Sequence, residues 1–373
     1  MSEPVRVLHV VTTMNRGGLE TMLMNYYRFI DRSKVQFDFL VHRNFKMDYE
    51  SEIKSLGGNI YYITRLIPWS IHYKKSLVNF FLRHKEFIIV HVHQDCLSSI
   101  ALKCAKRCGV PIRIAHSHNS RQPVNLKYLI KRYYMRYIPK YATSLFACGK
   151  EAGKWMFHKN NFIVVRNAID TYKFSYDVKI RSEMRKSLNI QPHEIVIGHV
   201  GRFSQQKNHT FLIRVFQELL KINNHFKLLL IGSGELESSI MEMVRSSGLY
   251  NRVTFLGKRS DVNKLMQAMD CFLFPSFFEG LPLVLVEAQA AGLLIIKSST
   301  ISDECVITPN VFSISLEKSA QEWAKIVYEK IKLYRRSNTD KYIIYNHYDL
   351  SFNARLLQDY YLKEFNRVNY KNK

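Results

Sequence analysis

The 373-residue sequence predicts an α/β protein with two tandem doubly wound domains, each built on a parallel sheet with helices on both faces. Two observations predict this architecture. Short apolar runs typical of fully buried strands alternate with segments that have the periodicity of amphipathic helices. The alternation ends near residue 164 and restarts near residue 195, after a polar and charged stretch. We therefore assign residues 1–168 to a first domain and residues 169–351 to a second.

Each strand of the first domain is predicted from its own apolar run. The runs are 5–11, 35–41, 59–63, 87–93, 111–116 and 144–148. After the first run, a loop with Gly17 and Gly18 leads into residues 19–30, whose apolar positions fall on one face of a helix. Ligands of doubly wound sheets bind at the carboxyl ends of the strands, so the residues that follow each strand are the first functional candidates.

The second domain repeats the architecture without repeating the sequence. Its apolar runs are 195–200, 226–231, 253–256, 271–274 and 293–296. A helix is predicted at about 210–220, and another at about 352–366 near the end of the chain. Residues 366–373 are expected to form a frayed tail.

Composition excludes several classes of protein. A hydrophobic content of 47% is too high for a disordered chain. The six cysteines lack the paired CxxC spacing of a zinc site, and no run reaches the roughly 18 apolar residues of a spanning helix. The first residues lack the basic head and apolar core of a signal peptide, so we expect a reduced, cytoplasmic protein.

The charge is unevenly distributed along the chain. The net charge is +24, and residues 1–165 hold 26 Lys and Arg against 10 acidic residues, whereas residues 166–373 hold 29 against 21. The first half therefore carries +16 and the second half +8. This asymmetry indicates two domains with different partners, and it admits a nucleic-acid partner as one reading.

The strongest chemical signal is a pair of carboxylates in residues 278–288. Glu279 lies on the loop before a helix predicted to begin at about residue 283, and Glu287 falls about one turn inside that helix. A helix N-terminus offers unpaired N–H groups and a positive dipole, which suit a diphosphate. Carboxylates beside it suit a hydroxyl-rich ligand, because they accept hydroxyl hydrogen bonds. The alternative interpretation is a capping carboxylate and a solvated glutamate.

Two loops that follow strands are candidates for phosphate binding. Arg202 and Lys207 lie at the two ends of a short loop, where arginine offers a bidentate fork and lysine a mobile point charge. In the first domain, Gly17 and Gly18 would let the backbone approach a phosphate closely. The alternatives are solvated basic side chains and an ordinary tight turn.

Histidines form two HxH pairs at strand ends. His116 ends the fifth run and His118 follows it by two residues, so by alternation the two side chains share one side. Such a pair could hold a metal ion, but no further ligand set of matching spacing is evident. For the similar pair His91 and His93 we favour a packed, structural role.

A family resemblance rests on Gly17 with Gly18, residues 115–117, Arg202 with Lys207, and Glu279 with Glu287. In this order these elements resemble the retaining GT-B glycosyltransferases of family 4, in particular the enzymes of bacterial exopolysaccharide and capsule synthesis. The resemblance covers nearly the whole chain, and the two glutamates around Gly-Leu-Pro are its most specific element. Residues 164–170 are similar to the family's Pro-Asn-Gly-Val-Asp segment, with Arg166 and Ala168 in place of the proline and glycine.

The resemblance implies an acceptor site in the first domain and a nucleotide-sugar site, for a UDP-sugar, in the second. Arg202 and Lys207 would neutralise the donor diphosphate, Glu287 would hold the ribose hydroxyls and Glu279 the hydroxyls of the transferred sugar. His116 would contact that sugar near its reacting centre. The expected catalytic residues are therefore His116, Glu279, Arg202 and Lys207.

Further features follow from the same resemblance. The additional donor-binding residues are Gly17, Gly18, Gly280, Leu281, Pro282, Leu283 and Val284, with His118 and Asn167 as further candidates. The terminal helix, at about 352–373, would cross back onto the first domain. Same-face attack would retain configuration, with the departing phosphate assisting deprotonation of the acceptor. We expect no metal or other cofactor, because no DxD-type acidic pair is present and Asp303 with Glu304 lies in no matching context.

Residues 121–140 combine six Lys or Arg, no acidic residue and four tyrosines. At helical spacing, an apolar stripe beside the cations would consist of Leu126, Ile130, Tyr133, Tyr134, Tyr137 and Ile138. Such a segment suits an anionic membrane surface. We therefore expect peripheral association with the inner face of the cell membrane and an acceptor linked to a lipid such as undecaprenol. The alternative is a core helix with a solvated basic face.

Three rival functions share part of this evidence. A nucleic-acid-binding protein accounts for the charge but not for two carboxylates at a helix start, and no RRM or OB pattern is present. Another GT-B enzyme, such as a nucleotide-sugar epimerase, would share the motifs. A dinucleotide-dependent oxidoreductase lacks support, because the first loop has no GxGxxG. We expect sugar transfer, with no nucleic acid among the partners.

Overall fold

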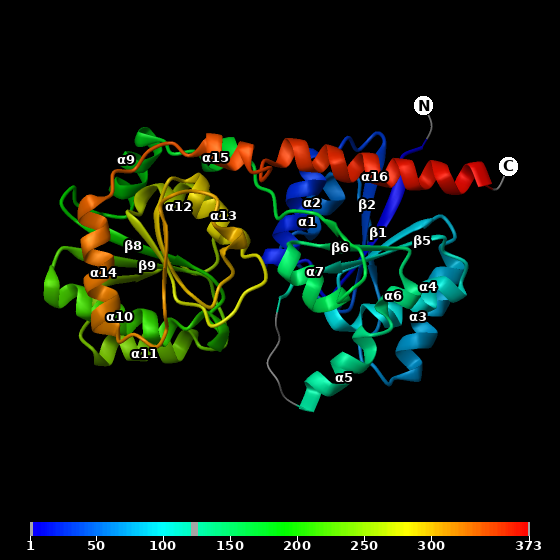
Figure 1. Cartoon of the computed structure of the whole chain (residues 1–373), viewed down its shortest axis with the longest axis horizontal. Coiled ribbons are helices and arrows are strands. Elements are labelled where there is room, and N and C mark those ends of the chain that lie inside the picture. Colours follow the sequence, from blue (N-terminus) through cyan, green and yellow to red (C-terminus); the bar gives the residue numbers. More distant parts are fainter. Residues whose placement is uncertain (1–2, 121–125, 372–373) are drawn as a thin grey trace. The chain divides into compact units, whose positions relative to one another are not determined.

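The structure, a computed structural model, describes residues 3–120 and 126–371. By its internal contacts the chain divides into two compact units: unit 1, Met1–Ile169 with Asp349–Lys373, and unit 2, Asp170–Tyr348. Within the described residues, each unit contains one sheet whose neighbouring strands all run parallel (Figure 1). The predicted fold class, two doubly wound parallel-sheet domains, is confirmed.

The sheet of unit 1 has seven strands among the described residues, in the order β3-β2-β1-β4-β5-β6-β7. The strands are β1 Val5–Val11, β2 Val35–Val41, β3 Ile60–Tyr62, β4 Ile89–Val92, β5 Ile112–Ser117, β6 Ser144–Ala147 and β7 Ile163–Val164. Val7 and Leu8, on opposite faces of β1, are both fully buried, which explains why the run is mostly apolar. The strand order reverses between β1 and β4, so the carboxyl ends of these two strands form the topological switch point of unit 1.

The helices of unit 1 cover its sheet, and the end of the chain supplies one of them. They are α1 Gly18–Phe29, α2 Glu50–Ser55, α3 Ile71–Arg83, the 3-10 turn η1 Asp95–Leu97, α4 Ser98–Arg107, α5 Leu126–Met135, α6 Ile138–Tyr141, α7 Lys150–Phe157 and α16 Leu350–Lys371. Helix α16 packs beside α1 and contacts β1 and β2 (Figure 1). Its residues Leu357 and Tyr361 enter the core of unit 1, and Gln358 Oε1 accepts a hydrogen bond from the backbone N–H of Asp31 at 2.7 Å.

The sheet of unit 2 follows the same plan, in the order β10-β9-β8-β11-β12-β13. Its strands are β8 Ile195–Val200, β9 Phe226–Ile231, β10 Val253–Phe255, β11 Cys271–Phe274, β12 Leu294–Ser298 and β13 Val311–Ile314. Its helices are α8 Thr171–Phe174, α9 Val178–Ser187, η2 Gln205–Lys207, α10 His209–Ile222, α11 Glu237–Ser246, η3 Tyr250–Arg252, α12 Val262–Ala268, α13 Leu283–Ala290, η4 Asp303–Cys305, α14 Ala320–Leu333 and α15 Asp340–Tyr345. Here the order reverses between β8 and β11, which places the switch point of unit 2 at their carboxyl ends.

Some predicted elements differ from the observed ones. Strands β7 and β13 are not predicted from the sequence, because they are short and partly exposed and so lack a continuous apolar run. The predicted frayed tail at 366–373 is wrong as far as Lys371, because α16 continues to that residue and Val368 still packs against the core of unit 1. No helix in the described residues is long and apolar enough to cross a bilayer.

The basic segment 121–140 is not one amphipathic helix. Residues 121–125 lie outside the described part of the chain, and the rest forms α5 and α6. Proline is tolerated in the first turn of a helix but not in its interior, so Pro139 fits the start of α6 and prevents one continuous helix. Ile138 is fully buried whereas Tyr133 is half exposed, so the predicted stripe is divided between core and surface.

Candidate functional site

Two loops meet at the switch point of unit 2. One follows β8 and contains η2, and the other follows β11 and leads into α13. Because β8 and β11 are neighbours in the sheet, both loops leave its carboxyl edge at the point where the strand order reverses. Ligands of open α/β sheets bind in the crevice at such a point. The fold therefore places the two strongest predicted loops at the expected ligand site of unit 2.

An ion pair joins these two loops. Lys207 Nζ lies 2.7 Å from Glu279 Oε1, and the two side chains are only 15% and 10% exposed. The Lys207 ammonium also lies 4.7 Å from the centroid of the Phe274 ring, at the end of β11. Lys207 and Glu279 are both predicted from the sequence as ligands of the nucleotide-sugar donor, but their pairing with each other is not predicted.

Hydrogen bonds between the loops hold this pair in place. Gln206 donates from its side chain to the carbonyl of Phe278 at 2.8 Å, and its own carbonyl accepts from the backbone N–H of Phe277 at 2.9 Å. Asn208 adopts a left-handed conformation, with φ of 56°, and donates from its side chain to the carbonyl of Pro275 at 3.2 Å. The position of Lys207 is thus fixed by the residues on either side of it.

A third loop, after β9, approaches the β8 loop through glycines. Gly232 has φ of +137°, and a Cβ atom built on it would lie 2.0 Å from the carbonyl oxygen of Gly201. A Cβ atom on Gly234 would lie 2.4 Å from the carbonyl oxygen of Phe203. Both positions therefore require glycine, because backbone would collide with any side chain. In the sheet, β9 and β11 lie on opposite sides of β8. The close approach of the β9 loop therefore shapes the edge of the site that lies away from Glu279.

Glu287 lies one turn inside α13, as predicted. Its side chain is buried, and burial raises its pKa to about 7, with the nearby cation Lys173 acting in the opposite direction. No hydrogen bond joins its carboxyl group to another side chain or backbone group in the described residues. A buried carboxyl group of this kind is suited to accept hydroxyl hydrogen bonds from a ligand. The first turn of α13, with Leu283 and Val284, provides the N–H groups that have no acceptor within the helix.

Arg202 is placed differently from Lys207. Its side chain is 73% exposed and pairs with Glu235, also exposed, at 3.0 Å. The structure therefore gives the two predicted phosphate ligands different carboxylate partners. An exposed pair of this kind is weak and can be exchanged for another anion at little cost.

The glycine loop of unit 1 begins α1. Gly17 is the N-cap residue with an extended backbone, and Gly18 is the first residue of the helix. A Cβ atom on Gly18 would meet nothing within 4 Å, whereas one on Gly17 would lie 2.4 Å from a carboxylate oxygen of Glu20. The space beside Gly18 is therefore open, as a ligand approaching the start of this helix requires. Asn167, the remaining candidate, is buried in the segment that leads out of unit 1.

His116 lies near the carboxyl end of its strand, as expected for a strand-end histidine. The strand β5 ends at Ser117, one residue later than predicted, and the side chain of His116 is 1% exposed. Burial, with neighbouring imidazoles, holds its pKa well below the usual range, and its Nε2 atom has no hydrogen-bond partner among the described residues. His118, beyond the end of the strand, is less completely buried and stacks on His116 with ring centroids 4.1 Å apart.

No further ligand set of matching spacing is evident for these histidines in the sequence, but the fold gives them histidine neighbours. Strand pairing brings together five imidazoles, which we name the histidine cluster: His9, His91, His93, His116 and His118. His9 comes from β1, and the others come from β4, β5 and the residues that follow them. Spacing alone could not reveal the cluster, because it depends on β1 and β4 being neighbours.

Comparison with known proteins identifies the family. The family model described as glycosyl transferases group 1 matches residues 180–349, which lie in unit 2 apart from the last residue. The putative glycosyltransferase EpsF of Bacillus subtilis (strain 168) is 37% identical over 336 residues, which cover 87% of this chain and 88% of that protein. The chain therefore belongs to the glycosyl transferases group 1 family, and it is a glycosyltransferase.

Two further similarities extend the comparison. A UDP-Gal:alpha-D-GlcNAc-diphosphoundecaprenol alpha-1,3-galactosyltransferase of Escherichia coli is 25% identical over 250 residues, covering 62% of this chain and 64% of that protein. Among solved structures, Anabaena HepE in complex with UDP and glucose superposes with a TM-score of 0.74 at 17% identity, covering 94% of both chains. The fold is thus the GT-B type, as the resemblance in the sequence predicted.

Proposed function

We propose that this enzyme transfers a sugar from a UDP-sugar held by unit 2 to a lipid-linked saccharide held by unit 1, with retention of configuration, in the assembly of a cell-surface polysaccharide. The observation that carries the proposal is the Lys207–Glu279 ion pair at the switch point of unit 2. HepE was crystallised with UDP and glucose, and the Escherichia coli relative is named for UDP-Gal and a diphosphoundecaprenol-linked acceptor. Both names support the proposed donor, and the second supports the proposed acceptor.

The ion pair fits the chemistry of the leaving group. Breaking the bond between sugar and diphosphate develops negative charge on the phosphate and positive charge on the sugar ring. On donor binding, Lys207 would exchange the Glu279 carboxylate for a phosphate oxygen, and Glu279 would then accept hydrogen bonds from the sugar hydroxyls. A cation fixed where negative charge develops lowers the barrier. The first turn of α13 adds a positive dipole, so the scheme needs no metal ion.

The remaining donor and acceptor contacts follow from the same assignment. Glu287 would accept hydrogen bonds from ribose hydroxyls, and Arg202 would leave its exposed pair with Glu235 for the diphosphate. The departing phosphate would take the proton of the attacking acceptor hydroxyl on the same face of the sugar, which retains configuration. His116 stays our proposed sugar contact in unit 1, with the more exposed His118 as its alternative.

A turnover assay tests the proposal. Purified enzyme is given UDP-sugars with diphosphoundecaprenol-linked saccharides, and the products are analysed by mass spectrometry and by NMR of the new linkage. We expect transfer with the anomeric configuration of the donor, unchanged by EDTA, and a decrease of at least tenfold in kcat for Lys207→Ala. Inversion of configuration, or activity lost with EDTA and restored by Mg²⁺, would contradict the mechanism. Turnover of the nucleotide-sugar without any acceptor would favour an epimerase.

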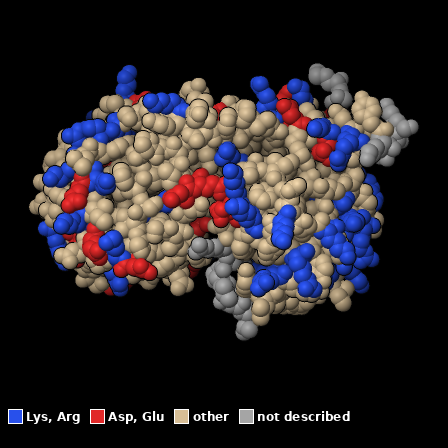
Figure 2. Space-filling view, viewed as in Figure 1, with Lys and Arg blue, Asp and Glu red and all other residues tan. Residues whose placement is uncertain are grey.

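A basic groove on unit 1 supports a membrane-borne acceptor. A cavity of about 620 Å³ opens between α3, α4 and the segment of α5 and α6. Its lining includes four cations and four tyrosines and no acidic residue: Lys74, Lys75, Lys103, Arg107, Tyr133, Tyr134, Tyr137 and Tyr141. Figure 2 shows Lys and Arg gathered over this part of unit 1. Exposed apolar side chains, Ile71 and Leu129 among them, lie on the same helices.

The groove combines the two features of a peripheral membrane surface, cations for anionic headgroups and apolar side chains for the acyl boundary. Liposome flotation tests this part of the proposal. The wild type should float with vesicles that contain anionic lipid and remain in solution with neutral vesicles. The triple variant K74Q/K75Q/K103Q should lose flotation, whereas K179Q/K186Q/K325Q, which removes the same charge from exposed positions of unit 2, should retain it. Equal flotation of both variants would exclude the groove as the membrane surface.

A further inference from the structure

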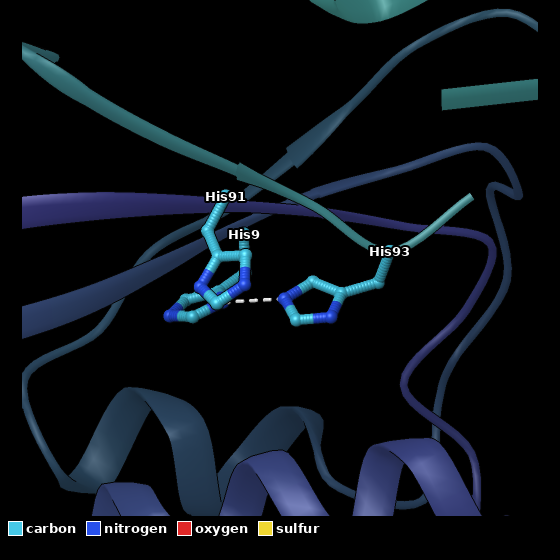
Figure 3. A group of neighbouring side chains, drawn as sticks. All are labelled: His9, His91 and His93. Carbon is cyan, nitrogen blue, oxygen red and sulfur yellow. Dashed lines mark hydrogen bonds between the residues drawn. The ribbon is translucent and has the colours of Figure 1, made fainter. Parts of the chain in front are cut away.

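Three imidazoles meet at the switch point of unit 1. His9 on β1 and His91 on β4 are paired in register, and His93 follows His91 by two residues and therefore lies on the same face of the sheet. Figure 3 shows the three rings pointing toward one another below the strands that carry them. The three histidines belong to unit 1, whereas Lys207 and Glu279 belong to unit 2.

The distances are those of a metal-ligand set. Each ring offers one nitrogen atom to a group in which all the ligand atoms lie within 4.8 Å of one another. His9 Nδ1 lies 3.0 Å from His93 Nε2 (Figure 3). Two nitrogen ligands of a tetrahedral ion with bonds of about 2.0–2.1 Å are separated by roughly 3.3 Å, so a small adjustment would seat an ion between them.

The other nitrogen atoms of two rings have the partners that metal-ligating histidines usually have. His91 Nδ1 lies 2.7 Å from the hydroxyl of Tyr361, and His93 Nδ1 lies 2.8 Å from His118 Nε2. Such outer hydrogen bonds fix the tautomer and orientation of a ligating imidazole. Because Tyr361 belongs to α16, the end of the chain takes part in orienting this set.

The environment keeps the rings neutral, which is the form that binds a metal. All three side chains are almost completely buried, and burial lowers the pKa of His9 to about 3 and the pKa of His91 and His93 well below the usual range. His9 Nε2 is buried and has no hydrogen-bond partner in the described residues. Hydrogen bonds between the rings therefore do not satisfy every polar atom of the group.

We propose that His9, His91 and His93 bind one transition-metal ion of the Zn²⁺ class, which ties β1 to β4 and has a structural role. Three neutral imidazoles suit zinc, cobalt, nickel or copper and do not suit Mg²⁺ or Ca²⁺, which prefer oxygen ligands. A water molecule completes the tetrahedron, and zinc lowers the pKa of such a water to about 7, so a bound hydroxide offsets part of the buried charge. The proposal is independent of the sugar-transfer mechanism, which uses no metal at the diphosphate.

Metal analysis of the full chain tests the site. The protein is purified without a histidine tag, stripped with a chelator, incubated with ZnCl₂ and desalted. We expect elemental mass spectrometry to find about one zinc ion per chain. The Tm should rise with ZnCl₂ but not with MgCl₂. With Co²⁺, the protein should show an absorption band typical of tetrahedral coordination. The variant H9Q/H93Q should lose all three responses.

A matched control separates this site from adventitious binding. His193 and His225 form an exposed edge-to-face pair in unit 2, with ring centroids 4.8 Å apart, so H193Q/H225Q should retain the full zinc content. If H9Q/H93Q does not fold, the zinc content and the Co²⁺ spectrum of H193Q/H225Q decide the matter. A folded wild type that retains less than about a tenth of an equivalent of zinc and shows no Co²⁺ band would overturn the proposal. The cluster would then be a stack of hydrogen-bonded neutral imidazoles.

Discussion

Lys207 Nζ and Glu279 Oε1 lie 2.7 Å apart, on two loops that leave neighbouring strands of unit 2 at the point where the strand order reverses. Each charge is largely removed from solvent, so the Lys207 ammonium depends on the Glu279 carboxylate for compensation. The same two groups are the proposed ligands of the donor phosphate and the donor sugar. In the proposed mechanism the pair keeps the site ordered until the negatively charged donor phosphate replaces Glu279 beside Lys207.

Substitution of Glu279 should reveal this dependence. Glu279→Gln keeps the shape of the side chain and leaves the Lys207 ammonium without its partner, so the free energy of unfolding should fall by about 1–3 kcal/mol. Urea unfolding measures the change. The control is Glu235→Gln, which removes the partner of Arg202 in an exposed pair and should change the stability by less than about 0.5 kcal/mol. Equal effects of the two substitutions would show that the Lys207–Glu279 pair is no stronger than a surface pair.

The buried carboxyl group of Glu287 should make stability depend on pH. Its pKa is raised from 4.5 to about 7 by burial, so between these values the folded state holds a proton that the unfolded state has lost. Stability therefore decreases as pH rises through this range. Relative to Glu287→Gln, which cannot ionise, the wild type should lose on the order of 3 kcal/mol between pH 4.5 and pH 8. Parallel pH profiles of the two proteins would refute the raised pKa.

Gly232 should tolerate no side chain. Gly232→Ala would place a methyl group 2.0 Å from the Gly201 carbonyl oxygen at a φ of +137°, so the β8 and β9 loops must separate. We expect a loss of more than about 3 kcal/mol and weakened donor binding. Gly248→Ala is the matched control, since Gly248 also has a positive φ, +69°, but open space around it, and it should cost about 1 kcal/mol. Thermal unfolding of both variants distinguishes a steric clash from backbone strain alone.

Two adjacent leucines of α16 test the contribution of this helix to unit 1. Leu357 is buried in the core of unit 1, whereas Leu356 is 53% exposed. Leu357→Ala should reduce the free energy of unfolding by about 2–4 kcal/mol, because it leaves a cavity. Leu356→Ala should change it by no more than about 0.5 kcal/mol. If both variants unfold like the wild type, α16 does not form part of the core.

The sequence predicted most of the fold because the strands of both sheets are buried on two faces. Runs such as 5–11 and 226–231 contain little but apolar residues and match β1 and β9. The short strands β7 and β13 escaped prediction, because they are partly exposed and their alternation is brief. In 121–140, composition alone favoured one helix, and Pro139 divides it.

The site was predictable only residue by residue. Lys207, Glu279 and Glu287 stand at recognisable positions after strands, so each could be named from the sequence. The pairing of Lys207 with Glu279 could not be predicted, because it depends on β8 lying beside β11. The histidine cluster was missed for the same reason: His9 and His93 are distant in sequence and become neighbours only when β1 and β4 pair.

The central claim, a nucleotide-sugar site in unit 2, is tested most directly by a thermal-shift panel of nucleotides and nucleotide-sugars. A donor that binds only the folded protein stabilises it by about 2.7 kcal/mol at a hundred times its Kd. We predict a rise of several degrees in Tm with UDP and a larger rise with one UDP-sugar, both reduced in Glu287→Ala and retained in Lys325→Gln, a substitution on the exposed face of α14. An unchanged Tm with every uridine nucleotide, or equal shifts in wild type and Glu287→Ala, would contradict the account.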